Sequence, residues 1–162
     1  MRSADPKTTQ IEAAYETAVR LLARRAHSRG ELARKLRRKG YADPIGNAAI
    51  DRCEALGYID DTAACESYCR ELIRKGYGPR AIHQRLTARA IHSDLIRSAL
   101  ATHYPEELVF TTATAVAHRK LRQLENRFRS PVELRPRLAR FLMQRGFTRD
   151  TVQAVMENLL AP

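Results

Sequence analysis

Disulfide bonds, membrane spans and secretion find little support in this sequence of 162 residues. It contains only three cysteines, Cys53, Cys65 and Cys69, an odd number without paired spacing, so no disulfide framework is predicted. No run of about 18 apolar residues occurs, which argues against a membrane-spanning helix. The opening stretch MRSADPKTTQ lacks the apolar core of a secretory signal, so we expect the protein to stay in the cytoplasm.

Sites for cofactors and catalysis are scarce as well. No glycine-rich phosphate loop occurs, which argues against an ATP site. Cys65 and Cys69 have a spacing that a metal ion could use, but they continue an apolar stripe, so burial in a core is favoured. The adjacent carboxylates Asp60 and Asp61 stand at a predicted helix start, where N-capping explains them. We therefore expect no catalytic residue, no metal ion and no cofactor.

Basic residues, in contrast, are abundant. Lys and Arg number 29 against 18 Asp and Glu, which gives a formal net charge of +11. Residues 1–59 carry 12 basic and 7 acidic residues, residues 60–105 carry 7 and 5, and residues 106–162 carry 10 and 6. Such an excess favours a polyanionic partner, which could be nucleic acid, an acidic protein groove or an anionic membrane surface.

Helical periodicity dominates the chain. Apolar residues recur at steps of three and four, and no convincing alternating strand occurs, so an all-α fold is predicted. Ser28 with Glu31 three residues later is a capping box, and Asp43-Pro44, Gly78-Pro79 and Ser130-Pro131 are typical helix starts. A glycine precedes an aromatic residue four times, in Gly40-Tyr41, Gly57-Tyr58, Gly76-Tyr77 and Gly146-Phe147. Each glycine is predicted to end a helix in the left-handed conformation, with the aromatic ring folded back onto that helix.

The apolar pattern repeats along the chain. A shift of fifty residues places Leu32 on Ile82 and Leu36 on Leu86 without a gap, and a third copy contains Leu138 and Leu142. We predict three three-helix repeats, over 1–59, 60–105 and 106–162, in an elongated and curved tandem array. The predicted helices cover 9–26, 29–39 and 44–56, then 61–75, 79–89 and 93–103, then 106–128, 131–145 and 149–160.

The repeats also show which charges the fold does not require. With Leu32 and Leu36 inward, helix 29–39 points Arg34, Arg37 and Arg38 outward and carries Lys35 on its flank. The outward positions are Gln84, Thr87 and Ala88 in the second copy and Arg137, Arg140 and Gln144 in the third. Because the core pattern persists while this charge varies, the cations are candidates for contact with a polyanion. The alternative, a merely solvated face, stays open. The candidate contact residues are Arg34, Lys35, Arg37, Arg38, Arg137 and Arg140.

Three stretches together resemble the RecX family, bacterial regulators of the RecA recombinase. They are RRAHSRGELARKLRRKGY, ALGYIDDTAACESYCRELIRKGYGPRAIHQRL and RLARFLMQRGFTRDTVQAVMENL, and the resemblance covers residues 12–160. Within them, the run from His27 to Leu36, the run Gly57-Tyr58-Ile59-Asp60-Asp61 and the run Gly76-Tyr77-Gly78-Pro79 resemble successive family signatures. The chain departs from the family pattern at Ala64-Cys65, where Phe-Ala is usual, and at Ala90, where glycine is frequent.

The resemblance implies a non-catalytic modulator built from tandem three-helix units. RecX proteins bind RecA filaments on DNA and inhibit ATP hydrolysis, strand exchange and co-protease activity. The implied partners are the RecA filament and single-stranded DNA, with double-stranded DNA as a second target, no membrane, and a monomeric chain. The alternative is a free-standing DNA- or RNA-binding protein with one basic helix in a groove. Helix 29–39 lacks outward Asn or Gln for reading bases, and its Arg and Lys suit phosphate better.

Overall fold

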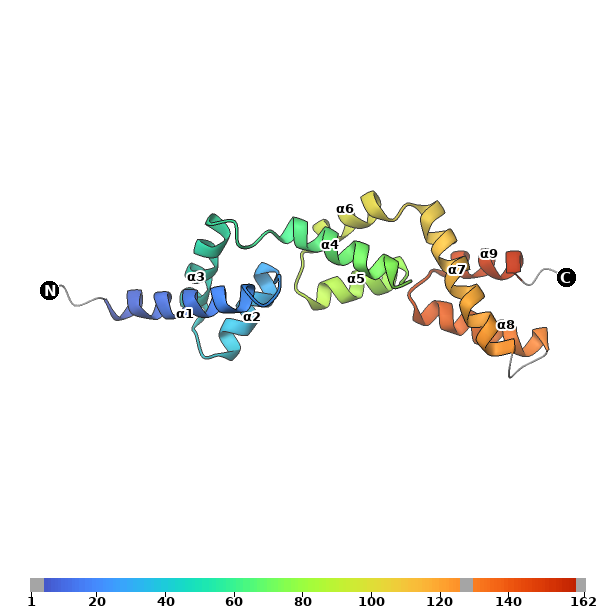
Figure 1. Cartoon of the computed structure of the whole chain (residues 1–162), viewed down its shortest axis with the longest axis horizontal. Helices are drawn as coiled ribbons and strands as arrows, with labels where there is room; N and C mark the ends of the chain where they lie inside the picture. Colours follow the sequence, from blue (N-terminus) through green and yellow to red (C-terminus); the bar gives the residue numbers. More distant parts are fainter. Residues whose placement is uncertain (1–4, 126–129, 160–162) are drawn as a thin grey trace. The chain divides into compact units, whose positions relative to one another are not determined.

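The computed structural model describes residues 5–125 and 130–159, and over these residues it consists of nine α-helices without a strand (Figure 1). The helices are α1 (Pro6–Leu22), α2 (Arg29–Arg38), α3 (Asp43–Ala55), α4 (Asp61–Arg74), α5 (Pro79–Ala88), α6 (Ser93–His103), α7 (Glu106–Glu125), α8 (Pro131–Gln144) and α9 (Arg149–Leu159). The predicted all-α class and the three successive three-helix repeats are confirmed. The ends of the predicted repeats (1–4 and 160–162) and residues 126–128 of the predicted helix 106–128 lie outside the described residues.

The first helix differs most from the prediction of 9–26, since it begins at Pro6 and ends at Leu22. Its start carries a signal that the prediction overlooked: the Asp5 carboxylate accepts a hydrogen bond from the Lys7 backbone N–H (3.1 Å), and Pro6 occupies the first helical position. Beyond its end, the Arg25 guanidinium donates to the Ala26 carbonyl (3.0 Å), which holds the chain in a turn.

Capping at the other helix starts follows the prediction in part. The Ser28 hydroxyl accepts from the Glu31 N–H (3.1 Å) and so caps α2. The Glu31 carboxylate does not complete a capping box, because it accepts two bonds from the Arg25 guanidinium instead. The predicted cap Asp43 is wrong, since it lies inside the first turn of α3 and Ala42 precedes that helix without a side-chain cap. Ser130 precedes α8 but makes no side-chain cap bond either.

The four glycines that precede aromatic residues all have positive φ, from +72° to +93°. At the end of α2, the Gly40 N–H donates to the Arg37 carbonyl (3.0 Å) and the Tyr41 N–H donates to the Leu36 carbonyl (3.2 Å). This pair of bonds is the predicted Schellman motif, and it recurs at the other three glycines. The aromatic residues differ in burial: Phe147 is fully buried, whereas Tyr58 is 52% exposed.

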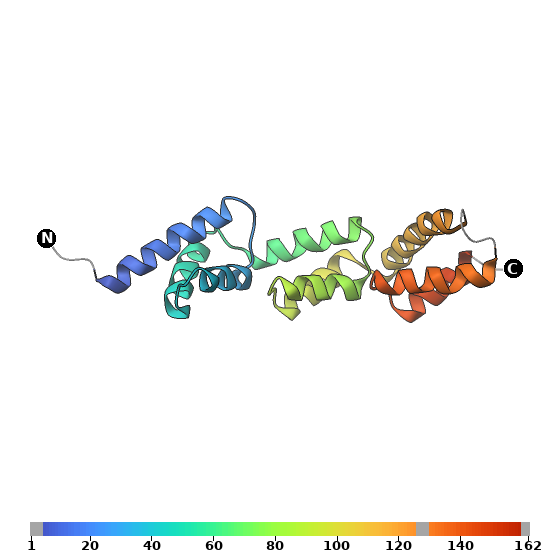
Figure 2. The ribbon, with the colours of Figure 1, turned by 90° about the horizontal axis from the view of Figure 1, so that it is seen from below.

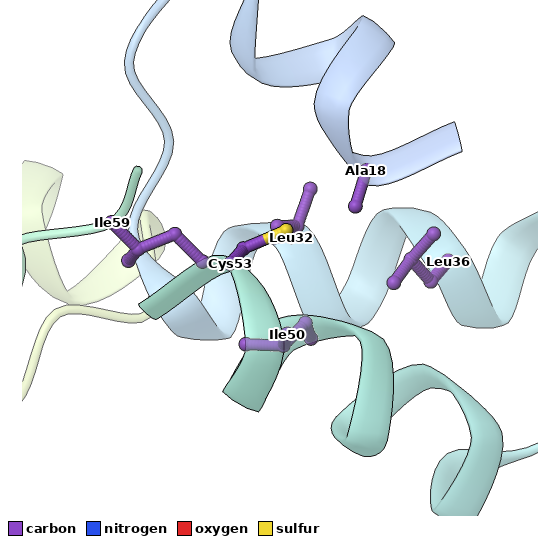
Figure 3. Close-up of a cluster of buried hydrophobic side chains, with 6 residues drawn as sticks. All are labelled: Ala18, Leu32, Leu36, Ile50, Cys53 and Ile59. Atoms are coloured by element: carbon purple, nitrogen blue, oxygen red, sulfur yellow. The ribbon is translucent and has the colours of Figure 1, made fainter. Parts of the chain in front are cut away.

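By contacts, the chain separates into two compact units, which are described one at a time. Unit 1 comprises residues 1–65 and 87–95, and unit 2 comprises residues 66–86 and 96–162. In unit 1, α1, α2 and α3 pack on a buried cluster of Ala18, Leu32, Leu36, Ile50, Cys53 and Ile59 (Figure 3). In unit 2, α7, α8 and α9 lie side by side (Figures 1 and 2), and their buried residues include Ala113, Ala117, Leu138, Leu142 and Val155.

Within unit 1, the turn that leads into α2 lies against the turn between α5 and α6. The Ser28 hydroxyl donates to the Arg89 carbonyl at 2.6 Å. Gly30 comes so close to Ala90 that an added Cβ would lie 2.6 Å from the Ala90 Cβ. Ala90 itself has φ +56°, the only positive φ among the described residues other than glycine.

Within unit 2, the turn between α4 and α5 lies in the same way against the turn between α8 and α9. The Gly78 N–H donates to the Arg145 carbonyl (2.7 Å), and the Arg80 N–H donates to the Gly146 carbonyl (3.1 Å). A Cβ on Gly146 would lie 2.3 Å from the Ala81 backbone nitrogen. Successive repeats therefore meet at turns, largely through main-chain atoms and small residues.

Candidate nucleic-acid and filament interface

The two faces of α2 point as predicted, with the leucines inward and the arginines outward. Leu32 and Leu36 are fully buried, and Arg34, Arg37 and Arg38 are exposed. Lys35 is partly buried, in line with its predicted place on the flank. The geometry of the helix is therefore as expected from the spacing of its two leucines.

The outward arginines of α2 differ in what their guanidinium groups already bind. Arg37 donates through Nε to the Asp43 carboxylate at 2.7 Å, so its charge is balanced by a carboxylate. Arg34 donates through Nη2 to the Ala88 carbonyl at 2.7 Å, which leaves its positive charge uncompensated. Arg38 has no side-chain partner among the described residues. The three arginines are therefore unequal candidates, and Arg38 is the one fully available to an outside partner.

Lys35 is bound to a buried histidine. The His27 side chain lies in an almost inaccessible position (3% exposed), with Nδ1 2.8 Å from the Arg25 carbonyl and Nε2 2.6 Å from Lys35 Nζ. These contacts require a neutral ring that donates from Nδ1 and accepts at Nε2. Burial, with the nearby positive charges of Arg25 and Lys35, lowers the pKa of His27 below its ordinary value.

The candidate residues of the third repeat lie on α8, in unit 2. Arg137 and Arg140 are both exposed, on a helix whose inward residues Leu138 and Leu142 are fully buried. Arg140 has no side-chain partner within the described part of the chain, whereas Arg137 takes part in an interaction within the protein. The α2 candidates belong to unit 1, so the structure places the two sets in different units.

Several other cations are balanced by carboxylates. Arg29 donates to both Asp51 and Glu54, Arg52 to Glu12 at 2.7 Å, Arg70 to Glu66 at 3.4 Å and Lys75 to Glu71. Burial alone would raise the pKa of Glu31, but the hydrogen bonds and charge of Arg25 hold that pKa below its usual value. The net charge of the sequence therefore overstates how many cations each surface offers.

The adjacent carboxylates Asp60 and Asp61 serve two helix starts. Asp60 accepts from the Ala63 N–H at 2.9 Å, which caps α4. Asp61 accepts from the Arg29 N–H at 2.7 Å, at the first residue of α2, so the pair ties the two helix starts together. Burial raises the pKa of Asp61, against the opposing effect of the bond from Arg29. Both carboxylates are thus explained by helix capping.

Two hollows lined by cations were not predicted from the sequence. In unit 1, a hollow of about 400 Å³ lies between α1 and the end of α2. We call it basic hollow 1, after its repeat. It is lined by Thr17, Arg20, Leu21, Arg24 and Lys39. In unit 2, a hollow of about 210 Å³ lies between α7 and the end of α8, here called basic hollow 3; it is lined by Lys75, Val116, Arg119, Lys120, Gln123, Phe141 and Arg145. The signal that could have revealed them is a second internal repeat, between the first helices of repeats 1 and 3.

The cysteines and the helices of the described residues bear on two kinds of feature, a metal centre and a membrane-spanning helix. Cys65 and Cys69 are buried, with exposed fractions of 1% and 0%, as the apolar stripe predicted. No group of three or more potential metal-ligating side chains gathers within the described residues. Over those same residues, none of the helices combines the length and the apolar character that a membrane crossing requires.

Comparison with known families assigns all three repeats. Residues 14–53 match the RecX first three-helix domain, residues 60–100 match the second, and residues 106–156 match the third. The three matches follow one another in the order of the family and cover most of the chain.

Similar proteins and solved structures agree with this assignment. The chain is 34% identical over 146 residues to a regulatory protein RecX of Legionella pneumophila (strain Corby), covering 90% of this chain and 94% of the relative. It is 35% identical over 147 residues to one of Halorhodospira halophila, covering 88% and 86%. The crystal structure of RecX from Lactobacillus salivarius shares the fold, with a TM-score of 0.81 at 23% identity over 95% of this chain and 99% of that one. RecX proteins are regulators and not enzymes, and this chain belongs to the RecX family of regulatory proteins.

Proposed function

We propose that this chain is a negative regulator of the RecA recombinase, which binds the RecA–DNA filament in the cytoplasm and inhibits its ATPase, strand exchange and co-protease activities. The observation that carries the proposal is the ordered match of all three RecX domains over residues 14–156. The net charge of +11 supports it, because a filament on DNA offers phosphate groups and acidic protein surface together.

Inhibition would follow from preferential binding to one state of the filament. A regulator shifts an equilibrium only by as much as its affinities for the two states differ. A chain with separate contact surfaces on its repeats can touch more than one subunit, and it would then oppose the subunit movements that accompany ATP turnover.

The direct test is the ATPase activity of RecA on single-stranded DNA, with the chain added at substoichiometric amounts. We expect inhibition well below one chain per RecA subunit. The second candidate function, a free-standing DNA- or RNA-binding protein, predicts DNA binding without any effect on RecA beyond competition for DNA. Full RecA activity at every ratio would contradict the proposal.

A pair of variants with the same change in charge tests the α2 surface. Arg38→Gln removes a cation without a partner, whereas Arg37→Gln removes one that is balanced by Asp43. We expect Arg38→Gln to weaken inhibition more than Arg37→Gln, with helix content unchanged in both. Inhibition by both variants equal to that of the unaltered chain would mean that this face of α2 is not a contact surface.

A further inference from the structure

The two basic hollows occupy equivalent places in repeats 1 and 3. A shift of 99 residues carries the buried Ala14 and Ala18 of α1 onto the equally buried Ala113 and Ala117 of α7. The same shift carries the lining of hollow 1 from α1 and the turn after it onto the α7 lining of hollow 3, position for position: Thr17 onto Val116, Arg20 onto Arg119, Leu21 onto Lys120 and Arg24 onto Gln123.

The second helix completes each hollow in the same manner. Lys39 ends α2 immediately before Gly40, and Arg145 ends α8 immediately before Gly146, so both cations occupy the C-cap position of a Schellman turn. One architectural position in repeats 1 and 3 therefore gathers three cations without a carboxylate partner among the described residues: Arg20, Arg24 and Lys39 in hollow 1, and Arg119, Lys120 and Arg145 in hollow 3. Hollow 3 is also lined by Lys75, which is paired with Glu71.

Among the described residues no carboxylate balances these cations, in contrast to Arg29, Arg52 and Arg70. In hollow 1, Arg20 donates only to neutral oxygens, of Glu16 (backbone) and Thr17, and the side chains of Arg24 and Lys39 have no partner among the described residues. In hollow 3, Arg119 likewise has none, and Lys120 lies 5.2 Å from the centre of the Phe141 ring. Arg145 donates to the Lys75 carbonyl at 2.9 Å and lies near the Tyr77 and Phe141 rings.

The partial negative charge at a helix C-terminus opposes anions, but it amounts to about half a unit charge against three full positive charges in each hollow. Holding three like charges around a hollow is unfavourable unless an anion enters, since their mutual repulsion is only partly screened by salt. Guanidinium and ammonium groups that converge in this way are the groups that proteins use for phosphate.

The middle repeat breaks the pattern. Cys65 and Cys69 of α4 correspond to Ala14 and Ala18, and the position of Arg20 and Arg119 is then taken by Glu71. The Glu71 carboxylate accepts a hydrogen bond from Lys75, the residue at the position of Arg24. The same fold is thus built with an acidic residue at this position, so the three-cation arrangement is not needed for folding.

We infer that basic hollows 1 and 3 are two equivalent binding sites, each for one phosphate group of a nucleic-acid backbone. Two copies of one site in one chain suit a polymer that presents the same group at intervals, as the phosphates of a nucleic-acid backbone do. Phe141 in the lining of hollow 3 also offers a ring beside the phosphate contacts. The inference deepens the proposed function, since it names the chemical group that the chain would contact on the DNA of a filament.

The test measures binding of the full chain to a fluorescently labelled oligo(dT) without RecA. Arg24→Gln/Lys39→Gln neutralises hollow 1, and Arg119→Gln/Lys120→Gln neutralises hollow 3. Arg52→Gln/Arg70→Gln is the matched control, because it removes the same charge from two exposed cations that carboxylates already balance and that are not candidate contact residues. Circular dichroism checks whether all variants keep the helix content and thermal unfolding of the unaltered chain.

We expect each hollow variant to weaken binding about fivefold at 0.1 M salt and to make the double-logarithmic salt dependence shallower by about 0.7, the value for one phosphate on a single strand. The control pair should retain nearly the original affinity and slope. Lys39→Arg and Lys120→Arg should keep full binding. Equal losses in the control and hollow variants would overturn the inference, since they would show a response to net charge alone.

A variant with the opposite expected effect strengthens the design. Glu71→Gln frees Lys75, which lines hollow 3, and should therefore tighten oligo(dT) binding and steepen its salt dependence. Glu66→Gln is the control of equal charge, because Glu66 pairs with Arg70 and His103 and does not line that hollow. Equal effects of these two variants would also overturn the inference.

Parallel RecA ATPase assays separate this inference from the proposed function. Hollow variants that bind oligo(dT) normally but no longer inhibit RecA would mean that the hollows take carboxylates of a protein partner, which contradicts the inference and leaves the proposed function intact. A chain that binds oligo(dT) through the hollows but never inhibits RecA would leave the inference intact and contradict the proposed function.

Discussion

Gly40 and Ala90 are equivalent residues, fifty positions apart. Their comparison shows how the free energy of the left-handed backbone conformation depends on the side chain. Gly40 has φ +93° and Ala90 has φ +56°, each directly after the last turn of the second helix of its repeat. The left-handed conformation costs a residue with a Cβ roughly 1–2 kcal/mol relative to the right-handed one, and glycine largely avoids this cost. The departure of Ala90 from the family pattern, noted in the sequence, thus has a local energetic consequence.

Substitution of this alanine should stabilise the protein. We expect Ala90→Gly to raise the free energy of unfolding by about 0.5–1 kcal/mol, because relief of the backbone strain exceeds the added entropy of the unfolded chain. The reverse change Gly40→Ala, at a site with no atom within 4 Å of an added Cβ, should lower it by about 1 kcal/mol. Denaturant unfolding of both variants provides the measurement, and a destabilised Ala90→Gly variant would contradict this account.

His27 is a residue whose contribution depends on pH. Its pKa is lowered by burial in the folded chain, whereas in the unfolded chain it is close to 6.5. Above that pH the ring is neutral in both states, so the stability is complete. As the pH falls from about 6.5 towards the folded-state pKa, the unfolded state binds the proton first and the stability decreases.

The measurement is the change in unfolding free energy between pH 7.5 and pH 5, in the unaltered chain and in His27→Gln, which cannot titrate in this range. We expect the unaltered chain to lose more stability over this interval than the variant does, because the carboxylates contribute equally to both. A difference of the opposite sign would mean that the ring gains a partner on protonation, in place of losing its bond from Lys35.

At the scale of helices and turns, the contact between the α8–α9 turn and the start of α5 depends on the absence of a side chain. Gly146 and Gly40 share the same left-handed role at φ +87° and +93°. A Cβ at Gly146 would overlap the Ala81 backbone nitrogen at 2.3 Å, whereas a Cβ at Gly40 would meet nothing. The two glycines therefore separate backbone strain from steric overlap.

Gly146→Ala should accordingly destabilise the protein by more than the roughly 1 kcal/mol expected of Gly40→Ala, since backbone atoms must also move apart. Thermal unfolding gives the comparison, and amide hydrogen exchange at Gly78 and Arg80 reports on the junction directly, because both N–H groups donate across it. Equal unfolding temperatures for the two variants would show that the turns do not pack as described.

The helices themselves were largely predictable, and the reasons are local. Leu32 and Leu36 repeat at helical spacing, and Gly40-Tyr41 ends the helix through bonds that involve only neighbouring residues. The pairing of Arg37 with Asp43 and of Lys35 with His27 was not foreseen, because it depends on side-chain conformations at a turn. The start of α1 was missed although Asp5-Pro6 carries the same type of signal as Asp43-Pro44.

The candidate site was predictable only in part. Helical spacing correctly placed Arg34, Arg37 and Arg38 on the surface, but spacing cannot tell a balanced cation from an unbalanced one. The basic hollows combine residues that are distant in the sequence, such as Arg24 with Lys39 and Arg119 with Arg145. Their convergence depends on how the helices pack, so it emerges only in three dimensions.

For the whole molecule, the net charge of +11 predicts that DNA affinity falls with ionic strength. Between 50 and 200 mM salt, the two basic hollows alone would reduce affinity for a single strand about sevenfold, and a footprint of six phosphates would reduce it several hundredfold. Fluorescence anisotropy across this range therefore counts the contacts. An oligonucleotide with neutral methylphosphonate linkages is the control, and it should bind weakly at every salt concentration. If binding of the natural oligonucleotide did not depend on salt, the electrostatic argument would be wrong.

The turn-to-turn junctions have a consequence for how such chains can vary in length. The middle repeat carries both halves of the junction, the turn at Gly78–Arg80 and the turn at Ala88–Ala90, and each meets its counterpart with main-chain atoms or small residues. A duplicate of that repeat, inserted in tandem, would find a compatible turn on each side. The number of repeats is thus a property that could change by gene duplication alone, independently of the charges that each repeat displays.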